Sequence, residues 1–155
     1  MKKIVVGFSV STVKFPIGSW LIRLWQGGTE YSHVYIKLLT TPRFPSNKIL
    51  HAAEGQVCHY SETAFLKRNK IIQEYVIQVP DSIYDQLRRD IFHELAGEPY
   101  SYLQNIGIVL VKIAKLFGKN IKNPWYKGWN CSEYVAKVLN IVYPDSLKAY
   151  DPDTI

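Results

Sequence analysis

Alternation of apolar and polar residues predicts two neighbouring strands in the first half of the chain. In residues 31–38, every second position from Val34 onward is apolar, and His33 falls on the opposite, more polar face. Residues 48–54 are a second strand candidate, and turn-forming residues separate the two segments. A hairpin would therefore lay His51 of the second strand beside His33 of the first.

Helical periodicity dominates much of the second half. Apolar residues recur every four positions from Ile83 to Leu95, after Asp81 as a helix cap, and Gly97 is a natural end for that helix. Strands gathered in the first half, with helices at both ends of the chain, predict an α+β fold built on an antiparallel sheet. The same signals predict strands at residues 1–8 and 71–79, and helices at residues 17–26, 61–69 and 106–117.

Residues 130–135 place a thiol where a helix is about to begin. Val135, Val138 and Leu139 follow Cys131 by four, seven and eight positions, which is the spacing of one helical face. Cys131 therefore falls in the first turn, on the side facing the core. Because a helix N-terminus stabilises an anion, it lowers the pKa of a cysteine and favours the nucleophilic thiolate. The alternative interpretation is a small buried apolar residue.

A nucleophilic thiol needs a base, and the chain has four histidines. His33 lies on the polar face of its strand, where its imidazole can meet a side chain from another element. His51, on the adjacent strand, can orient that ring and determine its tautomer. Taken singly, each could equally be a half-buried strand residue that hydrogen bonds to the backbone. His93, within the periodic segment that follows Asp81, is interpreted as structural.

Together, residues 32–34, 49–52 and 130–135 resemble the NlpC-type papain-like superfamily of cysteine hydrolases. In its common members the cysteine helix precedes the histidine strand, whereas here the order is reversed. The reversed order resembles the circularly permuted branch, which includes the YiiX-like hydrolases and the lecithin retinol acyltransferase group. Residues 18–23 and 97–102 also fit that branch, so the resemblance touches most of the chain.

The resemblance implies a circularly permuted papain-like fold, in which an antiparallel sheet or small barrel packs against helices. It also implies Cys131 as the nucleophile at a helix N-terminus, His33 as general base and acid, and His51 as the orienting third residue. Many YiiX-like members have a glutamate as the third residue, which makes Glu54 a rival. In a straight strand, positions 51 and 54 point to opposite faces, so only one of them can face His33 unless a bulge intervenes.

These roles imply cleavage of an amide bond through a thioester, by a peptidase or amidase that needs no metal or cofactor. The backbone N–H of Cys131 would be the first donor to the oxyanion. Tyr31, Tyr126 and Trp129 are candidates for the substrate-binding wall, or they simply cover the core. Two alternatives remain: a lipid acyltransferase or thioesterase using the same site, and a catalytically silent binding module.

Length and composition fit one domain spanning residues 1–155, which we expect to be a monomer. The chain is 47% hydrophobic, and its two cysteines, Cys58 and Cys131, do not form a disulfide framework of the kind found in small secreted proteins. The first residues are too few and too β-branched for a signal peptide, so a cytoplasmic location is expected. Release or delivery by a particle is also compatible with the sequence.

The net charge of +6 bears on partners. Residues 106–117 are too short to cross a bilayer and contain Lys112 and Lys115. With Lys119, these lysines form either a basic patch suited to an anionic surface or a solvated helix face. The expected substrates are a peptide, a cell-wall polymer or an acyl-lipid. The aromatic residues match no stacking motif for nucleic acid, and no such partner is expected.

Overall fold

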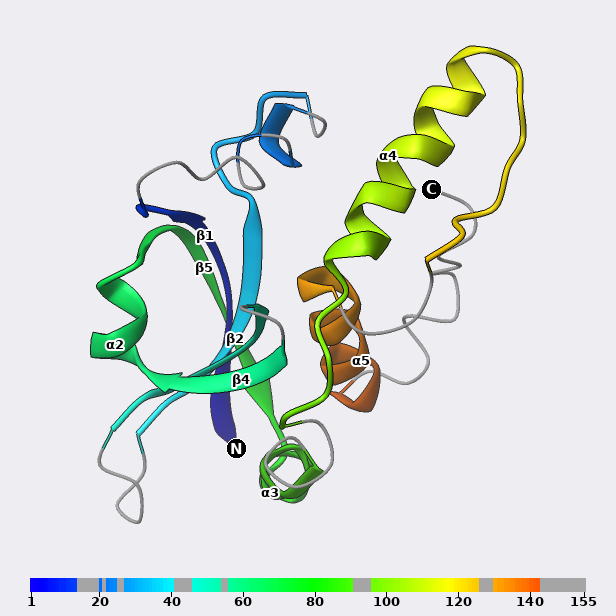
Figure 1. Ribbon diagram of the computed structural model, residues 1–155. Coiled ribbons are helices and arrows are strands. Elements are labelled where there is room, and N and C mark those ends of the chain that lie inside the picture. The colour runs from blue at the N-terminus through cyan, green and yellow to red at the C-terminus, as the bar shows by residue number, and fades with distance from the viewer. Residues whose placement is uncertain are drawn as a thin grey trace.

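An antiparallel sheet of five strands, in the order β4-β3-β2-β1-β5, forms the centre of the molecule (Figure 1). The computed structural model describes residues 1–13, 20, 22–24, 27–40, 46–53, 56–90, 96–125 and 130–142. The sheet confirms the predicted α+β class and its antiparallel pairing. Its strands are β1 (Lys2–Ser11), β2 (His33–Leu38), β3 (Lys48–Ala53), β4 (Gln56–Ser61) and β5 (Asn69–Val79).

Helix α2 follows β4, and three longer helices follow β5. Ser61 caps α2 as predicted, since its hydroxyl accepts a hydrogen bond from the Ala64 N–H, but the helix is shorter than expected because β5 already begins at Asn69. Gly97 has a φ of 90°, the conformation predicted for a helix end, while residues 91–95 lie outside the described part. The helices are α2 (Glu62–Leu66), α3 (Asp81–Asp90), α4 (Tyr102–Leu116) and α5 (Cys131–Val142).

One face of the sheet packs against α5 and forms the larger hydrophobic core. Alternate residues of β2 point into this core, as their spacing predicted, and so do alternate residues of β3. Helix α3 closes one side of it with Tyr84 and Leu87. The core residues of β2, β3 and α5 are Val34, Ile36, Leu38, Leu50, Ala52, Tyr134, Val135, Val138 and Leu139.

The opposite face curves around α2 (Figure 1). Phe65 of α2 is buried there with Tyr35 of β2 and Ile49 of β3. Helix α2 packs on both β4 and β5, the two edges of the sheet, so it fills the gap between them. Within the described residues β4 and β5 do not pair with each other, and the sheet is therefore open rather than a closed barrel.

An ion cluster around the buried Lys37 ties this second face together. Nζ of Lys37 lies 2.8 Å from Glu62 of α2 and 2.7 Å from Glu74 of β5. Burial alone would lower the pKa of Lys37, but its hydrogen bonds to the two carboxylates outweigh that effect and the pKa is raised. The hydroxyl of Tyr35 donates to Glu74 at 2.6 Å. Lys37 therefore stays charged and links β2, α2 and β5.

Candidate active site

Cys131 is the first residue of α5, in the first turn as its spacing predicted. The Asn130 side-chain oxygen accepts hydrogen bonds from the Glu133 N–H at 2.8 Å and from the Ser132 hydroxyl at 2.7 Å. In return, the Glu133 carboxylate accepts from the Asn130 N–H at 3.3 Å. This reciprocal capping box fixes the start of α5 at the cysteine. The Asn-x-x-Glu spacing of residues 130–133 is the sequence pattern of such a capping box and could have predicted it.

The sulfur of Cys131 lies at the beginning of β2. The backbone N–H groups of Val34, Ser132 and Cys131 itself act on it as hydrogen-bond donors, and each lowers the pKa of the thiol. Burial has the larger effect, and with the nearby Glu133 charge it raises the pKa of Cys131 above its ordinary value. The lowered pKa expected from helix position alone is therefore not found. The thiol is protonated at neutral pH.

The hairpin of β2 and β3 brings the two predicted histidines together. Nε2 of His33 lies 2.9 Å from Nδ1 of His51, and the two rings meet edge to face. Burial, and to a smaller extent the neighbouring His51, lowers the pKa of His33 to about 3. His33 is therefore a neutral imidazole at any physiological pH, and a weaker proton acceptor than an ordinary histidine.

A second cysteine extends this pair. Cys58 of β4 lies directly opposite His51 in the β3–β4 ladder, and its sulfur is 3.4 Å from Nε2 of His51. The three side chains thus form a row in the order His33, His51, Cys58. Cys58 was not among the site residues predicted from the sequence. The available signal was Gly55 between two strand-like segments, a sequence pattern typical of a short hairpin turn.

The histidine row and Cys131 belong to different faces of the sheet. The His51 ring packs against Phe65 at 5.3 Å between centroids, on the side covered by α2. Cys131 begins α5, which covers the other side, and its sulfur reaches the N–H of Val34, one residue beyond His33. In the described part of the chain, the hydrogen bond of the His33 ring goes to His51 and none joins it to the thiol. The sulfur thus lies beside the main chain of His33.

The remaining predicted substrate residues are only partly visible. Tyr31 is partly buried just before β2, and its ring packs on Phe8 at 4.8 Å between centroids. Glu54, Tyr126 and Trp129 lie outside the described residues. Of the two candidates for the third residue, His51 contacts His33, and Glu54 lies outside the described residues.

A buried hydroxyl close to His33 had no place in the sequence analysis. Ser9 of β1 is the cross-strand partner of His33 and is fully buried. Its hydroxyl has no hydrogen-bond partner among the described residues. Burying a hydroxyl without a hydrogen bond costs free energy, because the hydroxyl loses its hydrogen bonds to water. Ser9 is therefore an additional polar group at the edge of the candidate site.

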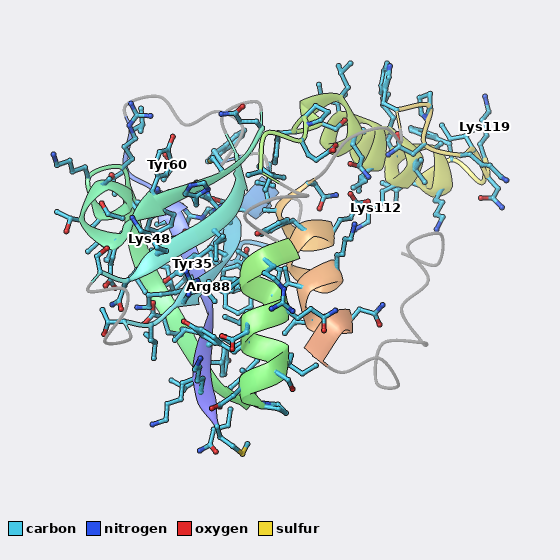
Figure 2. All side chains as sticks on the ribbon, turned by 90° about the horizontal axis from the view of Figure 1, so that it is seen from below. Tyr35, Lys48, Tyr60, Arg88, Lys112 and Lys119 are labelled. Carbon is cyan, nitrogen blue, oxygen red and sulfur yellow. The ribbon has the colours of Figure 1, made fainter. Side chains whose placement is uncertain are left out.

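Lys112, Lys115 and Lys119 lie on or just beyond α4. Lys112 is partly buried, whereas Lys115 and Lys119 are exposed. Lys119 lies on the side of the molecule away from the sheet (Figure 2). The three residues therefore belong to a surface distinct from the candidate active site.

Among the described residues, no three His, Cys, Asp or Glu side chains gather closely enough to hold a metal ion. None of the described helices combines the length and apolar character required to span a membrane. Comparison of the chain with protein-family models, with curated proteins and with solved structures found no match.

Proposed function

We propose that this chain is a cysteine hydrolase that cleaves an amide bond through a thioester, on a circularly permuted papain-like fold. Cys131 is the nucleophile, His33 the general base and acid, and His51 the orienting residue. The observation that carries the proposal is the 2.9 Å approach of His33 Nε2 to His51 Nδ1, in a structure that also presents Cys131 at a helix start beside β2. The order of histidine strands before a cysteine helix supports the permuted fold.

The role of His33 as the base determines which tautomers His33 and His51 must adopt. To accept the thiol proton, His33 needs a free lone pair on Nδ1, the ring nitrogen nearer its main chain, because Nε2 faces His51. Nε2–H of His33 then donates to Nδ1 of His51. His51 must carry its own proton on Nε2, which faces the sulfur of Cys58. Cys58 thereby acts as an acceptor that favours the required tautomer of His51.

A neutral thiol and a neutral imidazole favour proton transfer in step with attack. The Cys131 proton moves to Nδ1 of His33 while the sulfur bonds to the substrate carbonyl carbon, and the Cys131 N–H stabilises the oxyanion. His33 returns the proton to the departing amine as the C–N bond breaks, leaving a thioester. Water attacks the thioester, giving a proton to His33, which passes it to the sulfur as the acid is released.

This sequence of steps requires His33 Nδ1 and the sulfur to come within hydrogen-bond distance. The β2–β3 ladder pairs Ile36 with Leu50 and does not continue to His33 in the described residues. Among the described residues the start of β2 forms ladder pairs with β1 only, so the proposed reaction needs the His33 side chain to turn from the α2 side of the sheet toward the thiol. Catalytic hydrogen bonds are often loose before substrate binds.

Covalent trapping tests the proposal. The protein is incubated with acyl-amide and acyl-lipid probes, and peptides are mapped by mass spectrometry for an acyl adduct. We expect the adduct on Cys131, its loss in Cys131→Ala, and a much slower reaction in His33→Ala. Cys58→Ser is the matched control, since it removes the other thiol but keeps the adduct on Cys131. Turnover that persists in Cys131→Ala, or an adduct on Cys58 instead, would falsify the nucleophile assignment.

A lipid acyltransferase or thioesterase is the second candidate function. It uses the same thioester, but the acyl donor or acceptor is a lipid. The exposed apolar side chains of α4 favour it, because they offer a surface for a lipid substrate. The probe panel separates the two functions: acyl-lipid probes should then acylate Cys131 faster than acyl-amide probes. Failure of every probe to acylate Cys131 would favour a binding module.

A further inference from the structure

Helix α4 carries an exposed apolar stripe. Its members recur at alternating intervals of three and four residues, so they lie along one side of the helix. Leu103 and Ile106 are 52% and 50% exposed, and Phe117, which continues the stripe past the end of α4, is 77% exposed. Large apolar side chains in a continuous exposed row mark an interaction surface. The α4 stripe consists of Leu103, Ile106, Leu110, Ile113 and Phe117.

The first turns of α4 are anchored to neighbouring parts of the molecule. Gln104 donates from its side chain to Glu133 of α5, and its carbonyl accepts from Asn123 at 3.1 Å. Gly107 is buried against Asn123 so closely that a Cβ would lie 1.7 Å from the Asn123 side-chain oxygen. No other described helix or strand packs extensively on α4, which projects beyond α5 away from the sheet (Figure 1). The α4 stripe is therefore left uncovered by these elements.

The sequence segment that contains α4 carries charge of a single sign. From Pro99 to Ser132 the sequence contains no aspartate or glutamate, although the chain has thirteen acidic residues in all. Lys112 and Lys115 lie on the side of α4 away from the stripe, and other lysines follow the helix. A helix with an apolar row on one side and lysines on the other matches those that lie in a membrane interface. The lysines of this segment are Lys112, Lys115, Lys119, Lys122 and Lys127.

We propose that α4 binds the surface of an anionic lipid bilayer, with the α4 stripe at the boundary of the acyl chains and the exposed Lys115 and Lys119 among the headgroups. Charge complementarity selects this occupant. A second copy of the chain would bring two segments of equal positive charge together. An anionic bilayer instead attracts the lysines and accepts the apolar stripe. The proposal does not depend on the reaction at Cys131.

Co-sedimentation of the full chain with vesicles tests the proposal. We expect binding to phosphatidylcholine vesicles that contain phosphatidylserine, little binding to pure phosphatidylcholine, and weaker binding as salt rises. Ile106→Gln with Ile113→Gln should lower the affinity at least about ten-fold, because both side chains lose apolar burial. Lys115→Gln with Lys119→Gln should lower it about thirty-fold, since each lysine near the surface contributes roughly a five-fold gain.

Matched control variants test whether the loss of vesicle binding is specific to the α4 surface. They remove the same kinds of charged and apolar residues from elsewhere on the protein. Val76→Gln removes an exposed apolar residue of β5, and Lys3→Gln with Lys70→Gln removes two exposed charges from the sheet. Both controls should bind as the unchanged protein does, and so should Cys131→Ala. Equal losses in the controls, or no binding to phosphatidylserine at low salt, would overturn the proposal.

Two further outcomes would also overturn it. Binding that needs the lysines but is indifferent to Ile106→Gln with Ile113→Gln would be electrostatic adhesion without insertion of the stripe. A concentration-dependent dimer, seen by light scattering and abolished by the same pair of substitutions, would identify a second copy as the occupant. Circular dichroism of each variant verifies that α4 remains helical, and the salt dependence of the unchanged protein provides a test that needs no variant.

Discussion

Nε2 of His33 lies 2.9 Å from Nδ1 of His51, across the hairpin formed by β2 and β3. A ring held by a neighbour at one nitrogen is committed to using the other nitrogen for chemistry. The nitrogen of His33 that His51 holds is Nε2, so Nδ1 is the nitrogen that the proposed reaction would use. The pair thus sets both the orientation and the tautomer of the proposed base.

Replacing His51 tests that relationship. His51→Ala removes the partner of His33, and we expect the rate of acylation of Cys131 to fall about ten- to a hundred-fold, the range seen when an orienting partner is lost. His51→Gln keeps a polar group at the position and should recover part of the rate. Binding of the substrate to a Cys131→Ala background should not change. A His51→Ala protein that is fully active would remove His51 from the site.

Cys58 should act through His51 rather than on the substrate. Cys58→Ala removes the sulfur that faces Nε2 of His51 at 3.4 Å, so His51 is free to take the other tautomer. We expect a loss of about ten-fold in rate and a change in the nitrogen chemical shifts of His51 measured by NMR. Cys58→Ser keeps an acceptor and should restore both. Loss of rate with unaltered His51 shifts would instead indicate a packing role.

The pH dependence of alkylation distinguishes a neutral pair from an ion pair. Burial raises the pKa of Cys131 and lowers that of His33, so the resting thiol is protonated at neutral pH. Alkylation of Cys131 by iodoacetamide should therefore be slower than that of free cysteine and should rise about ten-fold per pH unit through the alkaline range. Peptide mapping separates Cys131 from Cys58. Rapid alkylation of Cys131 in mild acid would contradict the neutral pair.

Stability should depend on pH through His33. Its pKa is about 3 in the folded protein against an ordinary value of 6.5, so between these values the unfolded chain binds a proton that the folded chain does not. The free energy of unfolding is therefore unaffected by His33 above the ordinary pKa of 6.5. It falls as the pH drops from there toward the folded pKa of about 3, by up to about 1.4 kcal/mol per pH unit. Urea unfolding across this window measures the slope, which should be smaller in His33→Gln.

The cap of α5 should contribute to stability as well as to placement of the thiol. Asn130→Ala removes the side-chain oxygen that accepts from Ser132 and Glu133, and we expect the free energy of unfolding to fall by about 1 kcal/mol. Asn140→Ala, an exposed position of the same helix, is the matched control and should be close to neutral. Equal effects of the two substitutions would argue against the capping box.

Local patterns in the sequence were sufficient for the elements that carry the site. Alternation placed His33 opposite Val34 and Ile36, and helical spacing placed Cys131 in a first turn, because each pattern reflects repeats of only a few residues. The pairing of His33 with His51 was also within reach, since a hairpin joins segments that are close in the sequence. The serine signal at Ser61 correctly marked the cap of the helix that follows it.

Tertiary structure alone decided the charge states and the partners. The pKa of Cys131 depends on how deeply α5 buries the sulfur against β2, a quantity that no local spacing encodes, and burial outweighs the helix N-terminus. The contact of Cys58 with His51 and the separation of His33 from Cys131 onto two faces likewise follow from how the sheet curves and packs. Short-range periodicity determines which element a residue belongs to, whereas desolvation is determined by residues distant in the sequence.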